Sequence, residues 1–289
     1  MLVRVLIELA LAVSVLTILS IGLFVGRQRL VQTLREWPGR VKAMAPITLI
    51  LVVVLLFNSV ARQIVPDLSW MVGWDATWWI YETEGQFIIW MQQQATPEIT
   101  AYFSFIYIHG YVFMLIFPVI AYFALPNTRP LRELLGAYTL NYTLGLICYI
   151  FVIAYGPRNV MPELTQALLY DTYPHYQHLT RQVNRNTNVF PSLHTSLSAT
   201  VALLAYRTRD IYPTWFVVAT ILAVSVAIST MYLGIHWAID VVAGLVLAWI
   251  CVNLSTYLVG RWSVNGALEA KTLTERVPSV RKLSFFKRE

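Results

Sequence analysis

The chain has 289 residues, of which 57% are hydrophobic and 12% are charged, and its formal net charge is +6. Soluble proteins carry about twice that share of charged residues, and disordered chains combine low hydrophobicity with high net charge. The composition therefore excludes both classes and predicts a membrane protein that crosses the bilayer several times. The two cysteines, Cys148 and Cys251, lie in apolar runs and predict neither a disulfide framework nor a zinc cluster.

Seven apolar stretches approach or reach the length of about 20 residues that a membrane-spanning helix needs. The first has no small-residue cleavage site and is followed by basic residues, so we expect a retained anchor rather than a signal peptide. Together the stretches predict an all-α membrane protein with about seven transmembrane helices. They cover residues 2–25, 43–62, 99–124, 133–155, 191–206, 213–232 and 235–259.

Basic residues fall on alternate connections between these stretches. The linker 26–42, the turns after residues 124 and 206, and the tail 260–289 hold sixteen of the 21 Lys and Arg residues. The linker 63–98 holds no Lys or Arg, and its acidic and Trp residues are typical of a segment at the headgroup level. Because basic loops remain cytoplasmic, we expect a multi-pass protein of the cell membrane with an outer N-terminus and a cytoplasmic C-terminus. Topology then explains the positive charge without nucleic acid, and the basic tail is expected to meet anionic lipids.

The first of three polar stretches at the outer side is Phe190-Pro191-Ser192-Leu193-His194. Ionisable residues at membrane-spanning helices usually mark function. Proline suits the first turn of a helix, and a helix N-terminus attracts phosphate. We therefore expect His194 to project from the first turn of the helix 191–206, beside a phosphate site. The alternative is a helix cap with an interfacial histidine.

The second stretch runs from Ser229 to Asp240 and contains His236. His236 and Asp240 are four residues apart, which places them on one face of a helix. An ionised Asp240 accepts the Nδ1 proton of His236 and leaves Nε2 free to attack. The alternative is a His–Asp pair that only satisfies its own polar groups between helices.

The third stretch is the loop 156–190, which supplies cations. The guanidinium groups of Arg158, Arg181 and Arg185 are candidates to bind phosphate oxygens. The spacing of His175 and His178 would suit a metal, but carboxylate and cysteine partners are sparse, so we expect a solvated loop and no metal. His109, which lies within the third span, is expected to be a packed polar bridge rather than part of the site.

Taken together, these stretches resemble the type 2 phosphatidic acid phosphatase (PAP2) superfamily. Residues 191–194 match its Pro-Ser-x-His motif, and Ser229, His236 and Asp240 match Ser-Arg-x5-His-x3-Asp. The residue pattern of the two motifs, including Tyr232, is closest to that of the inositol phosphorylceramide synthase-like branch. Two family cations are missing, because Thr230 occupies the arginine position and Phe151 stands seven residues before Arg158.

The resemblance covers roughly residues 100–255 and implies a six-helix catalytic core with an additional N-terminal span. We accordingly divide the chain into an anchor and basic linker (1–42), a PAP2-like membrane domain (43–259) and a basic cytoplasmic tail (260–289).

The resemblance also implies a mechanism without cofactor or metal. His236 would attack phosphorus, Asp240 would orient His236, and His194 would protonate the leaving oxygen and then activate water. Arg158 and the helix N-terminus at Ser192 would hold the phosphate oxygens, with Arg185 and Arg181 in support. The expected partner is a phosphorylated membrane lipid, and the expected reaction is hydrolysis of a lipid phosphate or diphosphate at the outer face.

Three alternatives remain open at this point. A phosphotransferase of the inositol phosphorylceramide synthase type would use the same chemistry with a lipid alcohol as acceptor. A transporter with a His–Asp relay would place polar residues along the depth of several spans, whereas here they gather at one end. A hydrolase using Ser192 and His194 is disfavoured because residues two apart on a helix point away from each other.

Overall fold

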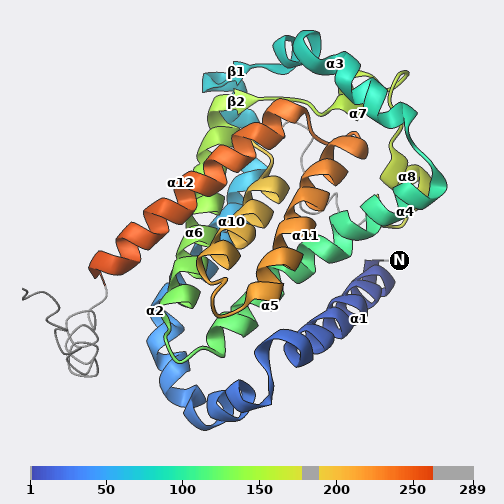
Figure 1. The fold of residues 1–289 in the computed structure, drawn as a ribbon. Helices are drawn as coiled ribbons and strands as arrows, with labels where there is room; N and C mark the ends of the chain where they lie inside the picture. Colours follow the sequence, from blue (N-terminus) through green and yellow to red (C-terminus); the bar gives the residue numbers. More distant parts are fainter. Residues whose placement is uncertain (1, 178–188, 263–289) are drawn as a thin grey trace, which may run out of the picture.

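The structure, a computed structural model, describes residues 2–177 and 189–262 and is built almost entirely of helices (Figure 1). The elements are α1 (Leu2–Ser20), the π-helix η1 (Ile21–Val25), α2 (Arg27–Val72), β1 (Trp74–Asp75), α3 (Thr77–Gln93), α4 (Pro97–Phe105), the π-helix η2 (Ile106–Gly110), α5 (Tyr111–Phe123), α6 (Arg129–Phe151), β2 (Val152–Ile153), α7 (Pro157–Val160), α8 (Leu168–Thr172), α10 (Leu193–Arg207), α11 (Pro213–Tyr232) and α12 (Ala238–Trp262).

Among the described residues, six helical segments are long and apolar enough to cross a membrane. They correspond to six of the seven predicted spans and confirm an all-α membrane protein that crosses the bilayer several times. The predicted span 191–206 is the exception, because α10 has only 15 residues. Such a helix is about 22 Å long, and α10 packs against α5, α6, α11 and α12 in the interior of the bundle. The six segments are Leu2–Val25, Arg27–Val72, Pro97–Phe123, Arg129–Phe151, Pro213–Tyr232 and Ala238–Arg261.

The segment 26–42, predicted as a linker, is helical and forms the first part of the 46-residue helix α2. Gly26, with a φ of 78°, separates α2 from η1. Arg40 then fixes this part of α2 to the bundle, because its Nη1 donates to the carbonyls of Phe123 (2.7 Å) and Leu125 (2.6 Å). Its guanidinium also pairs with Glu36 at 2.8 Å. These contacts join residues more than 80 positions apart, so no local sequence pattern indicated them.

The turns α1–α2, α5–α6 and α10–α11 lie toward one end of the bundle, and α3, α7 and α8 cover the other (Figure 1). At the first end the buried carboxylate of Glu133 is 2.8 Å from Arg129 and 3.9 Å from Arg207. Two basic turns are therefore held together by one acidic side chain.

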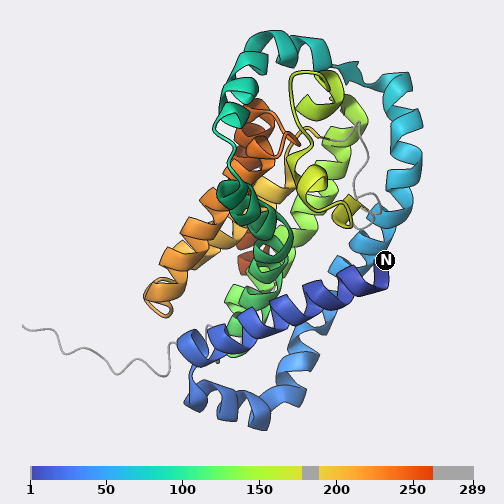
Figure 2. The same cartoon turned by 90° about the vertical axis from the view of Figure 1, so that its right-hand side faces the viewer.

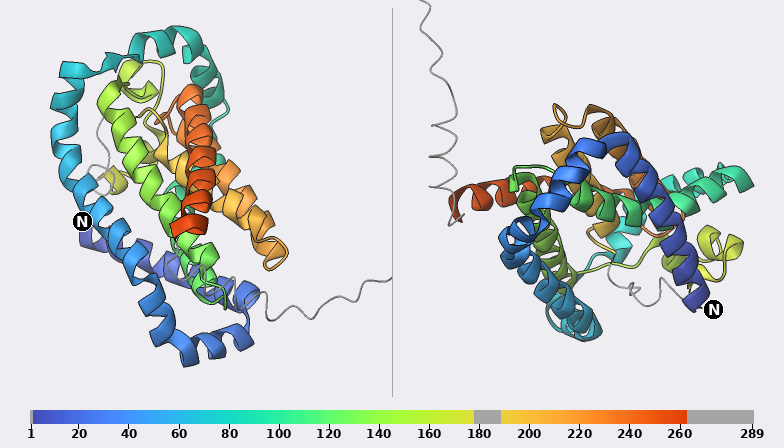
Figure 3. Two further views of the ribbon diagram at one scale, coloured as in Figure 1. Left: turned by 90° about the vertical axis from the view of Figure 1, so that its left-hand side faces the viewer. Right: turned by 90° about the horizontal axis from the view of Figure 1, so that it is seen from below.

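Helix α1 packs against α5 and crosses it at an angle (Figure 2). From their connecting turn, α1 and α2 run apart (Figure 1). Helix α6 lies between α2 and α12, and it packs against both (Figure 3). A parallel pairing of β1 with β2 joins the segment before α3 to the segment after α6. This pairing brings α3 over the end of the bundle where α11 turns into α12 (Figure 1).

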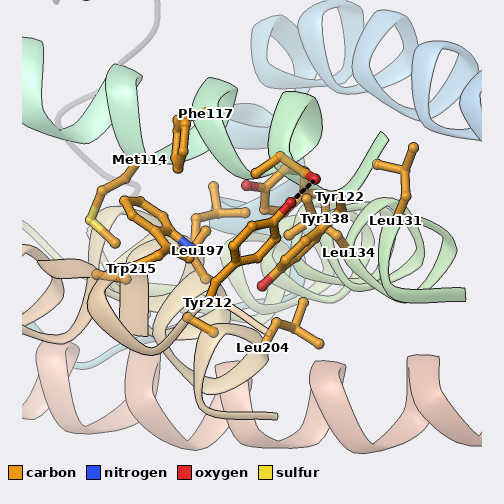
Figure 4. Close-up of a cluster of buried hydrophobic side chains, with 14 of the residues drawn as sticks. Met114, Phe117, Tyr122, Leu131, Leu134, Tyr138, Leu197, Leu204, Tyr212 and Trp215 are labelled. Carbon is orange, nitrogen blue, oxygen red and sulfur yellow. Dashed lines mark hydrogen bonds between the residues drawn. The ribbon is translucent and has the colours of Figure 1, made fainter. Parts of the chain in front are cut away.

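An aromatic core holds α5, α10 and α11 together (Figure 4). Phe117 and Trp215 are fully buried, with ring centroids 4.6 Å apart, and Phe24 of η1 packs on both rings. The Tyr212 hydroxyl donates to the Ala121 carbonyl at 2.9 Å. This core docks the N-terminal span onto the bundle as well as joining the later helices.

Helices α10 and α12 approach most closely near their N-terminal ends. The Ser192 N–H donates to the Asp240 carbonyl at 3.0 Å. A Cβ atom at Gly244 would lie 2.6 Å from the Ser192 carbonyl oxygen and 3.3 Å from Thr195. Only glycine fits at position 244 without displacing the start of α10.

We expect Gly244→Ala to force these two helix ends apart and to lower the melting temperature by several degrees, because the added methyl group meets backbone rather than a flexible side chain. Gly260→Ala is the matched control in the same helix, since its Cβ would make only an ordinary contact of 3.6 Å with Arg129. Alanine favours a helix over glycine by about 1 kcal/mol, so the control should be neutral or slightly more stable. Thermal unfolding in detergent measures both variants, and equal melting temperatures would contradict the close approach.

Candidate active site

A cavity of about 1120 Å³ contains both motif histidines. Its walls come from α1, α2, η2, α5, α6, the segment 158–177 and the N-terminal part of α10. Two arginines and several tyrosines give its wall a polar, cationic part, and leucines and a valine give it an apolar part. The residues that matter below are Leu9, Leu55, Arg62, Tyr107, Tyr111, Val112, Leu115, Tyr142, Tyr149, Arg158, Tyr170, His194 and His236.

His236 and Asp240 are adjacent, with Nδ1 and Oδ2 3.4 Å apart. The sequence predicted both on one helix face, but α12 begins at Ala238, so His236 lies in the turn before the helix. The contact instead follows from capping, since Asp240 Oδ2 also accepts the Trp237 N–H at 2.8 Å. A carboxylate that reaches back from the first turn toward the residue before the helix is typical of a helix N-terminus. The same cap therefore fixes the carboxylate and the imidazole.

The turn itself is fixed by backbone contacts. Both Ile235 and His236 donate their N–H groups to the Thr230 carbonyl at 3.0 Å, and Gly234 has a φ of 68° that favours glycine. The Trp237 indole donates to the Tyr155 carbonyl at 2.7 Å. His236 is therefore held from both sides of the turn.

Burial lowers the pKa of the His236 imidazole from 6.5 to about 3, an effect that a backbone hydrogen bond to Val189 opposes and the positive charge of Arg158 reinforces. The side chain is 6% exposed. At neutral pH the imidazole is uncharged, which is the form a nucleophile needs.

His194 occupies the second position of α10 and faces the same cavity. Its ring lies between those of Tyr107 (4.6 Å between centroids) and Tyr111 (4.3 Å). The His194 and His236 rings are 6.4 Å apart. The structure thus brings the two motif histidines together, with room between the rings for a reacting group.

Ser192 is the N-cap of α10. This agrees with the alternative prediction for residues 190–194, in which the stretch caps a helix. Its Oγ accepts from the Thr195 hydroxyl at 3.0 Å and from the Thr195 N–H at 3.4 Å. Ser192 is fully buried and does not line the cavity. Its geometry supports positioning of His194, and a direct contact with phosphate stays a prediction.

Arg158 reaches the cavity from α7. One guanidinium nitrogen, Nη2, donates to the Tyr170 hydroxyl at 3.3 Å, and the group lies over the Tyr170 ring at 4.7 Å. The other, Nη1, is buried and has no hydrogen-bond partner among the described residues. Arg158 as a residue lines the cavity, and a buried guanidinium with an unpaired N–H is suited to an anionic ligand.

Of the other predicted loop residues, the structure describes only His175. Arg181, Arg185 and His178 lie outside the described residues. His175 packs on Tyr176 at 4.4 Å and does not line the cavity. In the part of the chain that the structure describes, no group of three His, Cys, Asp or Glu residues could hold a metal ion.

The positions where the motifs lack a cation also lie away from the cavity. Thr230 is buried and its hydroxyl donates to the Ala227 carbonyl at 2.7 Å, while Phe151 is 56% exposed. His109 is buried against Phe105, at 4.9 Å between ring centroids, and does not line the cavity. His109 is thus packed as predicted, but its Nδ1 has no hydrogen-bond partner among the described residues, so the predicted polar bridge is not seen at that atom.

Glu84 of α3 is a residue that the sequence did not single out. Its two carboxylate oxygens accept the N–H groups of Ala238 (2.5 Å) and Ile239 (2.9 Å) at the start of α12. Burial raises the pKa of Glu84, an effect that these two hydrogen bonds oppose and the nearby Asp240 adds to. Glu84 thus caps the helix that carries Asp240. In the sequence, the only indication of this role was an acidic residue among the tryptophans of 63–98.

Arg62 of α2 is the second residue that the sequence did not single out, and it lines the cavity. Its guanidinium lies 6.0 Å from the centre of the Tyr149 ring. In the sequence, the only indication of this position was a basic residue at the end of the apolar run 43–62. The cavity therefore holds two arginines from different helices, although the motif positions lack two.

Comparison with known proteins identifies the family of the chain. A family model described as the PAP2 superfamily matches residues 70–254, and the chain belongs to that superfamily. An uncharacterized protein of Methanocaldococcus jannaschii is 29% identical over 160 residues, which are 54% of this chain. The matched region spans 62% of that relative's length. No solved structure matches the chain.

Members of this superfamily are generally phosphatases or phosphotransferases, and membership therefore supports an enzyme. The geometry suits that chemistry. A neutral imidazole held by a carboxylate, a second imidazole nearby and an unpaired guanidinium N–H can serve as nucleophile, acid–base group and anion holder.

The pKa of His236 predicts how stability depends on pH. In the unfolded chain the His236 imidazole takes up a proton near pH 6.5, but in the folded protein it does so only near pH 3. The contribution of His236 to stability is therefore complete above pH 6.5 and is lost as the pH falls toward 3. Between pH 7 and pH 4 we expect the free energy of unfolding of the wild type to fall by about 3 kcal/mol more than that of His236→Gln. Thermal unfolding in detergent across this range measures the difference. Parallel curves for the two proteins would contradict a neutral buried imidazole.

Proposed function

We propose that the protein is a membrane lipid phosphatase that hydrolyses a lipid phosphate or diphosphate through a His236 nucleophile. The observation that carries this proposal is the contact between Nδ1 of His236 and Asp240 in a cavity that also contains His194 and Arg158. A carboxylate at Nδ1 holds one tautomer and leaves Nε2 available for attack on phosphorus.

In the proposed reaction, Nε2 of His236 attacks phosphorus and the bond to the leaving oxygen breaks. His194 gives a proton to that oxygen and then takes one from the attacking water. Arg158 holds the phosphoryl oxygens as their charge redistributes, with Arg181 and Arg185 as further candidates. The second attack releases phosphate and restores the imidazole.

The apolar walls of the cavity support a lipid rather than a soluble phosphate ester. Leu55 of α2 and Leu115 of α5 line the same cavity as the histidines. The basic turns lie toward the opposite end of the bundle from α3 and α7. With basic turns in the cytoplasm, the site would face the extracytoplasmic side of the cell membrane.

A phosphotransferase of the inositol phosphorylceramide synthase type is the second candidate. It shares every residue role above and replaces water by a lipid alcohol in the second step. The neutral His236 and the cavity serve both reactions, so the products must distinguish them. A transporter with a His–Asp relay would yield neither product.

The test incubates purified protein with a panel of lipid phosphates and diphosphates, with and without alcohol acceptors and with and without EDTA. Inorganic phosphate and headgroup-exchanged lipid are measured together. We expect phosphate release that does not need a divalent ion and that falls on the order of 10³-fold or more in His236→Ala, because the nucleophile is lost.

The matched control is His175→Ala, which removes a histidine that does not line the cavity and should leave turnover unchanged. Thermal unfolding confirms that both variants are folded. Headgroup exchange without phosphate release would favour the transferase. Turnover retained in a folded His236→Ala would contradict the role of His236, and turnover restored only by a divalent ion would contradict the mechanism without metal.

A further inference from the structure

Arg62 is a charged residue of the cavity to which the steps above give no role. It lies on α2, outside the residues 70–254 that match the superfamily, so the family match assigns it nothing. The family motifs place their cations elsewhere. Arg62 nevertheless lines the same cavity as the two motif histidines.

The two cavity arginines lie beside the segments that carry different histidines. The Arg158 N–H donates to the Gly234 carbonyl at 3.1 Å, in the turn that carries His236, the proposed nucleophile. Arg62 lies 6.0 Å from the centre of the Tyr149 ring, and the Tyr149 hydroxyl donates to the Pro191 carbonyl at 3.3 Å, three residues before His194. The cavity thus has one cation on the side of the proposed nucleophile and another on the side of the histidine that would face the leaving oxygen.

Beyond Arg62 the cavity wall is polar for one turn of α2 and then becomes apolar. Asn58 and Ser59 line it first, and Leu55 lies two turns before Arg62. Leu9 of α1 and Val112 and Leu115 of α5 also line the cavity. A ligand that extends from His236 past Arg62 therefore meets a cation first, then a short polar stretch, and then hydrocarbon.

We infer that Arg62 forms a second anion subsite that holds the phosphate of the leaving group, and that the preferred substrate is a lipid diphosphate. The inference rests on the proposed function. The terminal phosphate would lie between His236 and Arg158, the phosphate attached to the lipid would lie at Arg62, and the tail would follow the apolar walls. A lipid monophosphate leaves an alcohol, which offers no anion for Arg62 to bind.

The step balances without a further reactant. His236 Nε2 bonds to the terminal phosphorus, the bond from that phosphorus to the bridging oxygen breaks, and the electron pair leaves with the bridging oxygen. Negative charge develops on the bridging oxygen beside Arg62, and His194 gives that oxygen a proton, so the leaving group is the lipid monophosphate. Water then attacks the phosphohistidine while His194 accepts its proton, which yields inorganic phosphate and free imidazole.

The test compares a prenyl monophosphate with the prenyl diphosphate of the same chain length, in the same detergent micelles. Wild type should prefer the diphosphate by kcat/KM and should release lipid monophosphate together with inorganic phosphate. Arg62→Gln should lose roughly 10- to 100-fold on the diphosphate, as expected for a lost charged hydrogen bond, and much less on the monophosphate. Arg62→Lys, which keeps the charge, should restore part of the preference.

Arg209→Gln is the matched control, because it removes the same charge from an exposed arginine at the α10–α11 turn. Equal losses on both substrates in folded Arg62→Gln, or a wild-type preference for the monophosphate, would overturn the inference and leave the phosphatase standing. Hydrolysis of neither substrate by wild type would overturn the inference together with the proposed function. If Arg62→Gln does not fold, the wild-type preference and the Arg62→Lys variant still decide.

Discussion

The close approach of the N-terminal ends of α10 and α12 is the contact on which the site depends. Ser192 donates its N–H to the Asp240 carbonyl at 3.0 Å, and Gly244 leaves the space that this contact needs. Each helix end carries one histidine at or beside its first turn. Backbone groups rather than long side chains set the distance between the two helix ends. The centroids of the two imidazole rings therefore lie 6.4 Å apart.

Helix capping then orients His194 and His236 at these two helix ends. Ser192 caps α10 behind His194, while Asp240 accepts the Trp237 N–H and contacts His236. Glu84 satisfies two more N–H groups at the start of α12. Free N–H groups at a buried helix end are costly, so α3 both covers this end of the bundle and stabilises it. The stability of the fold and the geometry of the site therefore rest on the same hydrogen bonds.

Much of the fold follows from the sequence because hydrophobicity and length are local properties. The spans near residues 2–25 and 213–232 are confirmed at the predicted positions. The helix through 26–42 was not predicted, because the buried contacts of Arg40 with Phe123 and Leu125 join distant segments. The stretch 191–206 forms a helix close to its predicted bounds, but α10 has only 15 residues and is packed among other helices, so it is not one of the six segments long enough to cross a membrane.

The site was predictable where residue spacing carries the geometry. His194, His236 and Arg158 line one cavity, and Asp240 contacts His236, as the motifs indicated. Glu84 and Arg62 were missed because their positions arise from the packing of α3 on the turn between α11 and α12 and of α2 on α6, which one sequence does not reveal. The roles assigned to Arg181 and Arg185 stay predictions, since both lie outside the described residues.

The central claim is that His236 becomes covalently bound to phosphorus, and trapping the intermediate tests it most directly. Protein mixed with a ³²P-labelled lipid phosphate or diphosphate is quenched within one turnover, digested and analysed by mass spectrometry. The account predicts an alkali-stable, acid-labile phosphate on the peptide that contains His236, and no label in His236→Ala. Label on His194 instead, or turnover at the full rate without any labelled peptide, would contradict it.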